Sequence, residues 1–334
     1  NNKNKLHLFR NMSQKMKYLI SLIMFTIIVY SFLVLMETGL GSISIEEEIK
    51  HPHSTREHYT IVINTFERPK LLSETVDHYS KCTRAKYIRI VWSEKEKPKK
   101  KVIEKYSKYH DPSVIFDINE EDSLNNRFKP LSEPFTEGIF TVDDDIRVTC
   151  TELDFAFDVW RLNRNNIVGF MPRTHVHSTK TNRLIYRAWW YVWWTGSYSI
   201  ILTKAAFLNH KFYYEYTNKL PIEMKKYIDE HRNCEDIAMQ FLISNITHLS
   251  PIFVKGHLTD LGALNGISTS QNVVTASHMD ERSECLNKLV EIFHHNPLVK
   301  SHIVVDTVTN RWAAAPSTWW EYISSDLWNF DSIS

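Results

Sequence analysis

The sequence lacks an excess of charge of either sign. Its 334 residues hold 40 basic and 39 acidic side chains, which leaves a formal net charge of +1. A protein that binds nucleic acid through bulk charge carries a strong basic excess, so this class of protein is disfavoured. We therefore expect no nucleic-acid partner, and we expect binding partners to be chosen by a defined site.

Cysteine is also scarce, and no two cysteines form a Cys-x-x-Cys pair. The four are Cys82, Cys150, Cys234 and Cys285. Their spacing disfavours a structural zinc site, and their even number suits two disulfides in an oxidising compartment. Four buried free thiols are the alternative.

After Tyr59 the chain lacks an internal repeat, a Gly/Ser linker and any low-complexity tract that would mark a domain boundary. With 43% apolar and 24% charged residues, it has material for a sizeable core, and wholesale disorder is excluded. One catalytic unit is expected.

A long apolar run without charge lies near the start of the chain. Residues 18–36 contain no charged side chain and have about the length that a helix needs to cross a bilayer. Basic residues precede the run and an acidic cluster follows it, so the positive-inside rule predicts a type II anchor with a lumenal domain. A cleaved signal peptide is the alternative, but no clear cleavage site follows the run.

The anchor divides the chain into five predicted segments. They are a cytosolic tail (1–17), a transmembrane anchor (18–36), a stem (37–58), a catalytic domain (59–312) and a C-terminal tail (313–334). The polar stem would hold the domain away from the membrane.

Strand-like and helix-like segments alternate through the predicted domain. Strands are predicted at 59–64, 88–92, 114–117 and 138–142, and helices at 71–79, 153–160, 204–216, 236–243 and 283–293. The Trp-rich block 189–202 has β propensity. This order predicts an α/β domain with a mainly parallel sheet flanked by helices, whose ligands bind at the carboxyl ends of the strands.

Three adjacent aspartates end one of these strands. Asp143, Asp144 and Asp145 directly follow the apolar run 139–142. Carboxylates this close disfavour joint ionisation unless a cation neutralises them. Hard oxygen ligands suit Mn²⁺ or Mg²⁺, which can bridge a diphosphate. A surface or helix-capping cluster is the alternative reading of the triplet alone.

Seven blocks of the sequence, taken in order, resemble the exostosin-like glycosyltransferases of family 64. They are NTFER (64–68), SLNNRF (123–128), VDDD (142–145), FAF (155–157), VGFMPR (168–173), NCEDIAM (233–239) and RSECLNKL (282–289). The resemblance runs from about Tyr59 to Val304. It implies a retaining, metal-dependent glycosyltransferase with the GT-A fold of nucleotide-diphospho-sugar transferases.

The resemblance also implies a donor site. Thr65 and Arg68 would line the nucleotide pocket, and Asn126 and Arg127 would hold the donor. Asp145 would ligate the metal, with Asp143 and Asp144 beside it. An Arg is suited to a diphosphate because its planar fork binds two oxygens at once. Without the resemblance, Arg68 would be a solvated turn residue before Pro69.

Asp236 and Arg282 are the catalytic residues that the resemblance implies. Asp236 would face the reacting carbon of the sugar, as nucleophile or as stabiliser of an oxocarbenium-like state, with Arg282 opposite. From the residues alone, Asp236 would be a helix N-cap and Arg282 a surface ion-pair partner. The resemblance further implies the disulfides Cys234–Cys285, near this pair, and Cys82–Cys150.

Several features resemble the plant members of the family, among them Cys82, Cys150 and the Trp-rich block. Single-anchor plant members resemble enzymes that add mannose to glycosyl inositol phosphorylceramide sphingolipids, which favours GDP-mannose as donor and the Golgi membrane, or the ER, as location. Transfer of GlcNAc or GalNAc from a UDP-sugar to a heparan-type or glycolipid acceptor is the alternative. A catalytically inactive lumenal scaffold is the reading from another class.

Two other features of the sequence suggest a role. The four tryptophans of 189–202 are interpreted as core and pocket wall, with contact to a sugar or a lipid surface as the alternative. His175 and His177 share a strand face and could ligate a metal. A polar or acceptor-side function for His175 is favoured.

Overall fold

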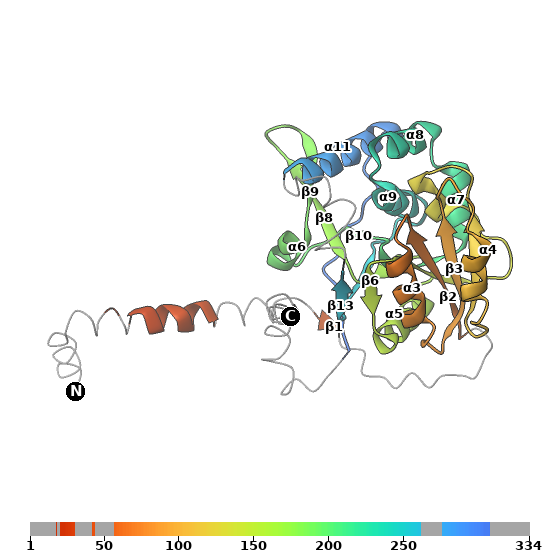
Figure 1. Ribbon diagram of the computed structural model, residues 1–334. Helices are drawn as coiled ribbons and strands as arrows, with labels where there is room; N and C mark the ends of the chain where they lie inside the picture. The colour runs from red at the N-terminus through yellow and green to blue at the C-terminus, as the bar shows by residue number, and fades with distance from the viewer. Residues whose placement is uncertain (1–17, 19–20, 31–41, 44–56, 262–275, 308–334) are drawn as a thin grey trace, which may run out of the picture. The chain divides into compact units, whose positions relative to one another are not determined.

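A computed structural model of the chain describes residues 18, 21–30, 42–43, 57–261 and 276–307 (Figure 1). The chain divides into two compact units, residues 1–42 and 43–334. In the first unit, residues 21–30 form a helix whose apolar side chains are exposed. Within the described ranges, no helix has the length and apolar character to cross a membrane. Parts of the predicted anchor (19–20 and 31–36), most of the stem and the C-terminal tail lie outside the described residues.

The second unit holds the predicted domain, in which β2 begins at Tyr59. In chain order the strands are β1 (Ser42–Ile43), β2 (Tyr59–Thr65), β3 (Ala85–Trp92), β4 (Ser113–Ile118), β5 (Gly138–Asp143), β6 (Ile146–Val148), β7 (Val168–Gly169), β8 (Pro172–Ser178), β9 (Arg183–Arg187), β10 (Ile200–Ile201), β11 (Ala205–Asn209), β12 (Ile252–Val254), β13 (Leu258–Asp260) and β14 (Val304–Val305). The helices are α3 (Pro69–Tyr79), α4 (Lys100–Tyr106), the 3₁₀ helix η1 (Leu124–Phe128), α5 (Cys150–Leu162), α6 (Trp189–Thr195), α7 (Lys211–Lys219), α8 (Ile222–His231), α9 (Glu235–Thr247) and α11 (Ala276–Phe293).

One large sheet organises the domain. Its nine strands lie in the order β1-β14-β12-β7-β11-β5-β2-β3-β4. The strands β4, β3, β2 and β5 are parallel neighbours, β7, β12 and β14 are parallel neighbours, and β11 is antiparallel to both β5 and β7. The prediction of a mainly parallel sheet in an α/β domain is therefore confirmed.

Helices cover both faces of this sheet, so the core has two parts. The alternation of β2 shows this directly: Ile61 and Ile63 pack with residues of α3 and α5, while Val62 packs with residues of α9 and α11. Strands buried on both faces are continuous apolar runs, which is why β2 and β5 were recognisable from sequence. The helix α9 is buried along residues 235–244, so the residues at its start are held by the core.

A smaller antiparallel sheet stands beside the large one. It has the strand order β10-β8-β9, and β8 and β9 form a two-stranded ribbon. In Figure 1 this ribbon reaches α11, and α6 lies on its outer side at the margin of the domain. The β8–β9 ribbon and α6 border the side of the domain on which α9 and α11 begin.

Two predicted elements are wrong in part, since residues 200–201 form the strand β10 and residues 211–216 lie in the helix α7. Residues 189–195 form the helix α6, not a strand, because β propensity is overridden by context. The helix ends at Gly196, which adopts the left-handed φ of 63° that glycine tolerates. Residues 205–209 are the buried strand β11 between β5 and β7, and the helix α7 begins only at Lys211. Backbone pairing to strands distant in sequence decided this segment.

Candidate active site

The carboxyl ends of β2 and β5 bring the first group of predicted site residues together. The two strands are parallel neighbours, with Asn64 opposite Asp143 in register. The backbone N–H of Asp144 donates to Asn64 O at 3.1 Å. Thr65 and Arg68 therefore lie beside the three aspartates, as expected where parallel strands end at one edge of a sheet.

Asp144 lies inside the fold and holds the neighbouring Arg68. Its side chain is fully buried, accepts a hydrogen bond from Thr65 Oγ1 at 2.7 Å on Oδ2, and forms an ion pair with Arg68 Nη2 through Oδ1. Burial raises the pKa of Asp144 to about 7 despite the nearby Arg68. The three groups form one unit in which Asp144 and Thr65 fix the position of Arg68.

Asp145 uses only one of its two carboxylate oxygens in hydrogen bonds to the described residues. Arg68 Nη1 donates to Asp145 Oδ2 at 2.9 Å, while the buried Asp145 Oδ1 has no hydrogen-bond partner among the residues that the structure describes. Burial and the nearby Asp143 raise the pKa of Asp145. An ionised carboxylate in this position is incompletely compensated, so a cation at Asp145 would stabilise it.

These residues fit a divalent cation that is shared with a substrate. Across the described part of the chain, no group of three or more His, Cys, Asp or Glu side chains could hold a metal ion by itself. Mg²⁺ in phosphate-transfer sites is commonly bound by one or two carboxylates plus substrate phosphates. Asp145, with Asp143 beside it, offers that kind of incomplete site.

Arg127 joins the aspartate group to the start of α9. Its Nη2 forms an ion pair with Asp143, and its Nη1 donates to Glu235 Oε1 at 2.7 Å. With its amide oxygen facing the guanidinium, Asn64 accepts from Arg127 Nη2 and Nε, both at 2.7 Å. Burial lowers the pKa of Arg127, but Asp143 and Glu235 outweigh burial and raise it, so this buried side chain stays charged.

Asn126, the neighbour of Arg127 on η1, is buried. Its Nδ2 donates to Ser93 Oγ at 3.0 Å and to Glu121 O at 2.6 Å, whereas its Oδ1 is buried without a partner. The amide therefore connects η1 to the loop that precedes it and to the end of β3.

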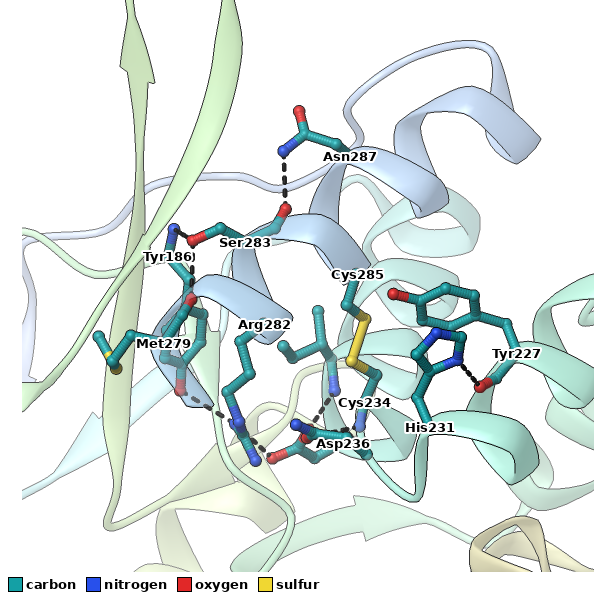
Figure 2. The surroundings of a disulfide bond; sticks show 12 residues. Tyr186, Tyr227, His231, Cys234, Asp236, Met279, Arg282, Ser283, Cys285 and Asn287 are labelled. Carbon is teal, nitrogen blue, oxygen red and sulfur yellow. Dashed lines mark hydrogen bonds and ion pairs between the residues drawn. A yellow bond between two sulfur atoms is a disulfide. The ribbon is translucent and has the colours of Figure 1, made fainter. Parts of the chain in front are cut away.

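Asp236 and Arg282, the predicted catalytic pair, meet across α9 and α11 (Figure 2). Arg282 Nη1 donates to Asp236 Oδ2 and to Tyr186 Oη, both at 3.1 Å, and the backbone N–H of Ile237 donates to Asp236 Oδ1 at 2.7 Å. Burial would raise the pKa of Asp236, but Arg282 and Arg127 outweigh burial and lower it. Asp236 is thus an ionised carboxylate that is only 4% exposed.

The N-cap reading of Asp236 is partly right. The residue before α9 is Cys234, with φ of 85°, and Asp236 is the second residue of the helix. Its carboxylate still accepts a backbone N–H of the first turn, where the helix dipole favours negative charge. The surface-pair reading of Arg282 is wrong, because its side chain is 14% exposed and carries the contact to Asp236.

Both predicted disulfides are present. Cys82 is bonded to Cys150, and Cys234 is bonded to Cys285. Figure 2 shows the second bond beside the Asp236–Arg282 pair, where it ties the residue preceding α9 to α11. It therefore holds together the two elements that carry the pair.

We expect the two disulfides to differ in their effect on catalysis. The bonds close loops with sequence separations of 68 and 51 residues, so replacing either pair by serine should lower the free energy of unfolding by about 2–4 kcal/mol. The double variant Cys234→Ser/Cys285→Ser should also lower kcat about tenfold, because it loosens the support of Asp236. Calorimetry and initial rates, with Cys82→Ser/Cys150→Ser as the matched control, test this. Equal kcat in both variants would contradict it.

Two residues of the site were not singled out from sequence. Glu235 accepts a hydrogen bond from Arg127, and Tyr186 accepts one from Arg282. Glu235 directly precedes Asp236, so its place at a helix start was a usable signal. Tyr186 lies 96 residues from Arg282 in the chain, and no local pattern marks it.

His175 is a buried hydrogen-bonding residue. Its Nδ1 lies 2.8 Å from Ser199 Oγ and its Nε2 lies 3.2 Å from Asn296 Nδ2, while His177 Nε2 lies 3.0 Å from Asn182 Oδ1. Both ring nitrogens of His175 are therefore occupied by neutral partners. Burial, with a smaller effect of Lys300, lowers the pKa of His175 to about 4.

This environment predicts a pH dependence of stability. The folded pKa of His175 lies below its unfolded value of about 6.5, so its contribution is full above pH 6.5 and is lost as the pH falls toward 4. The lost contribution should approach about 3 kcal/mol at the acid end. Urea unfolding from pH 7.5 to 4.5 should show a weaker pH dependence for His175→Gln than for the wild type. Identical curves would exclude His175 as the source.

The assembled site has two chemically distinct parts. Arg68, with Asp145, offers positive charge and an incomplete carboxylate ligand, which suits a metal-bound diphosphate. Asp236 offers a buried negative charge, which suits a carbon that becomes positive in the transition state. Arg127 spans the parts through Asp143 and Glu235. The geometry suits transfer of a group from a diphosphate.

Comparison with known proteins agrees with this chemistry. Residues 59–310 match the family model of the glycosyl transferase family 64 domain. The chain is 39% identical over 283 residues to glycosylinositol phosphorylceramide mannosyl transferase 1 of Arabidopsis thaliana, which covers 81% of this chain and 82% of that protein. It is 32% identical to exostosin-like 2 of Mus musculus, over 79% and 81% of the two chains. It is also 35% identical to exostosin-2 of Mus musculus over 72% of this chain, which spans 33% of that protein.

Proposed function

Because the chain belongs to glycosyl transferase family 64, we propose that it transfers mannose from GDP-mannose, with retention of configuration, to a glycosyl inositol phosphorylceramide or a related glycan. That it is a glycosyltransferase follows from the family; the donor and the acceptor are the proposal. The observation that carries the proposal is the 39% identity to the Arabidopsis mannosyl transferase over more than four fifths of both chains.

The site geometry supports the donor half of the proposal. Asp145 and Asp143 would hold Mn²⁺ or Mg²⁺ together with the donor diphosphate, and the bound ion would neutralise charge on the departing nucleotide. Arg68, fixed by Asp144 and Asp145, places a permanent positive charge on the same side. The mainly parallel sheet with these carboxylates at the end of β5 supports the GT-A fold that the proposal assumes.

The state of Asp236 supports a retaining transfer. Arg282 and Arg127 keep its buried carboxylate ionised, so it would present a fixed negative charge to the reacting carbon of a bound donor. Such a charge serves either as nucleophile or as stabiliser of an oxocarbenium-like state. Tyr186 restrains the orientation of Arg282 and, through it, of Asp236.

The proposed location is the Golgi membrane, with type II topology and a lumenal catalytic domain. The apolar run 18–36 supports the anchor, because basic residues precede it and an acidic cluster follows it. The two disulfides support an oxidising compartment.

Incubation with a panel of donors tests the proposal. The purified full chain is given GDP-mannose, UDP-GlcNAc or UDP-GalNAc with Mn²⁺, Mg²⁺ or EDTA, and a glycosyl inositol phosphorylceramide acceptor. We expect transfer from GDP-mannose that EDTA abolishes, and an α-linked product if the donor linkage is retained. Transfer from a UDP-N-acetylhexosamine alone would replace the proposed donor, and no transfer from any donor would favour the inactive scaffold.

A further inference from the structure

The four tryptophans of α6 are exposed. Their exposed fractions are 53% for Trp189, 52% for Trp190, 51% for Trp193 and 56% for Trp194. The other tryptophans that the structure describes, Trp92 and Trp160, are 7% and 2% exposed. The interpretation of this block as core and pocket wall is therefore wrong for these four side chains, which together cover a surface that needs an explanation.

All four rings point to one side of the helix. Their spacing of i, i+1, i+4 and i+5 spans about 140° at 3.6 residues per turn. Val192, on the other side, is buried, and Arg187 lies over the Tyr191 ring at 5.7 Å. Figure 1 shows α6 beside the β8–β9 ribbon, which it contacts. The exposed rings of Trp189, Trp190, Trp193 and Trp194 form what we call the tryptophan face.

The segment that contains β8, β9 and α6 carries charge of one sign in its sequence. From Pro172 to Thr195 the basic residues are Arg173, Lys180, Arg183 and Arg187, and no acidic residue occurs. Arg183 is paired with Glu284 of α11 at 2.6 Å, whereas Lys180 is exposed at the β8–β9 turn. A segment that combines tryptophan with basic residues has the composition of protein segments at membrane–water interfaces.

In sequence, the tryptophan face follows closely after a residue that contacts the Asp236–Arg282 pair. Tyr186 of β9, whose hydroxyl accepts from Arg282, precedes Trp189 by three residues. The strand β9 therefore contacts Arg282 and leads directly into α6, which carries the exposed rings. An acceptor that reaches Asp236 with its head group while its ceramide stays in a bilayer requires the site to lie near the lipid surface.

We propose that the tryptophan face of α6 inserts into the headgroup region of the membrane that carries the acceptor, and so brings the site to a lipid-embedded substrate. This inference rests on the proposed glycolipid acceptor, whose phosphorylceramide group is anionic and complements the basic side chains. Trp rings are amphipathic and settle at the headgroup level of a bilayer. The occupant of the surface is thus a lipid interface.

Other occupants fit this surface less well. At about 250 Å² per Trp and half exposure, the four rings offer roughly 500 Å², below the roughly 800 Å² per partner of a stable dimer interface. Sugars are bound in concave sites, and the outer side of a helix is convex. A bilayer accepts a convex helix face because lipids rearrange around it.

Fluorescence quenching tests the insertion without using donor or acceptor. The full chain is reconstituted in liposomes with anionic phospholipids, half of them brominated in the acyl chain, and tryptophan emission is compared with unbrominated liposomes. We expect the triple variant Trp190→Gln/Trp193→Gln/Trp194→Gln to lose at least about half of the wild-type quenching. A double variant at distant exposed side chains, Leu162→Gln/Tyr214→Gln, should keep it; these are 66% and 61% exposed.

Kinetics with two acceptors completes the test. For the triple variant, KM for a bilayer-embedded glycosyl inositol phosphorylceramide should rise about tenfold, while KM for the water-soluble head group without ceramide should stay within twofold. Equal quenching in wild type and triple variant, a change only in oligomeric state, or an equal rise of both KM values would overturn the inference. The quenching measurement needs no turnover. It therefore tests membrane insertion even if the proposed donor or acceptor is wrong.

Discussion

Replacing Asp236 by Asn is expected to lower kcat about a thousandfold or more. The substitution preserves the shape of the side chain but removes the buried negative charge that faces the reacting carbon in the proposed mechanism. Donor affinity should change little, because the donor diphosphate is bound on the side of Arg68 and Asp145. Initial rates with radiolabelled donor give kcat, and titration calorimetry gives the donor Kd.

Asp236→Asn should also destabilise the fold, and this effect must be separated from catalysis. Arg282 would keep a buried positive charge without its partner, which typically costs about 3–5 kcal/mol. In the double variant Asp236→Asn/Arg282→Met the unpaired charge is gone, so stability should partly return while kcat stays low. A single variant with kcat within tenfold of the wild type would remove Asp236 from the proposed chemistry.

Asp145→Asn is the second substitution with a large expected effect. It removes the charge beside the unpartnered Oδ1, so the affinity for a nucleotide with Mn²⁺ should fall about a hundredfold or more, and turnover should fall with it. Calorimetric titration of GDP with Mn²⁺, and again with EDTA, measures the metal-dependent part of binding. The two titrations should become nearly equal in the variant.

Stability distinguishes this effect from misfolding. Burial and Asp143 raise the pKa of Asp145, so its ionised form is disfavoured in the fold and a neutral amide should not lower the thermal midpoint. Asp111→Asn, at a surface carboxylate paired with Lys86, is the matched control and should leave binding unchanged. Undiminished Mn²⁺-dependent turnover in Asp145→Asn would refute the metal role.

The aspartate triplet shows how position in the fold separates identical residues. From sequence, Asp143 and Asp144 were both placed beside the donor. In the structure Asp144 is fully buried and bound by Thr65 and Arg68, so its effect on a donor passes through Arg68. Asp143 is partly exposed and bound by Arg127. The direction of each side chain depends on its place at the end of β5 and on its neighbours. Three identical residues in the sequence do not specify these directions.

The amino-acid sequence alone was sufficient to predict the features that depend on local pattern and on ordered motifs. The apolar runs of β2 and β5 predicted parallel strands, because strands buried on both faces need continuous apolar residues. The order of seven motifs indicated the family, and with it Asp236, Arg282 and both disulfide pairs.

The features that depend on contacts between distant segments became evident only from the tertiary structure. The pairing of β5 and β7 turned residues 205–209 into a strand, and the support of the β8–β9 ribbon let 189–195 form a helix with an exposed tryptophan face. Tyr186 reached Arg282, and Arg127 reached Glu235, across about 100 residues of chain. The physical reason is the same in each case: backbone hydrogen bonds, burial and ion pairs are satisfied by whichever partners folding brings close, and local propensity is weaker than these contacts.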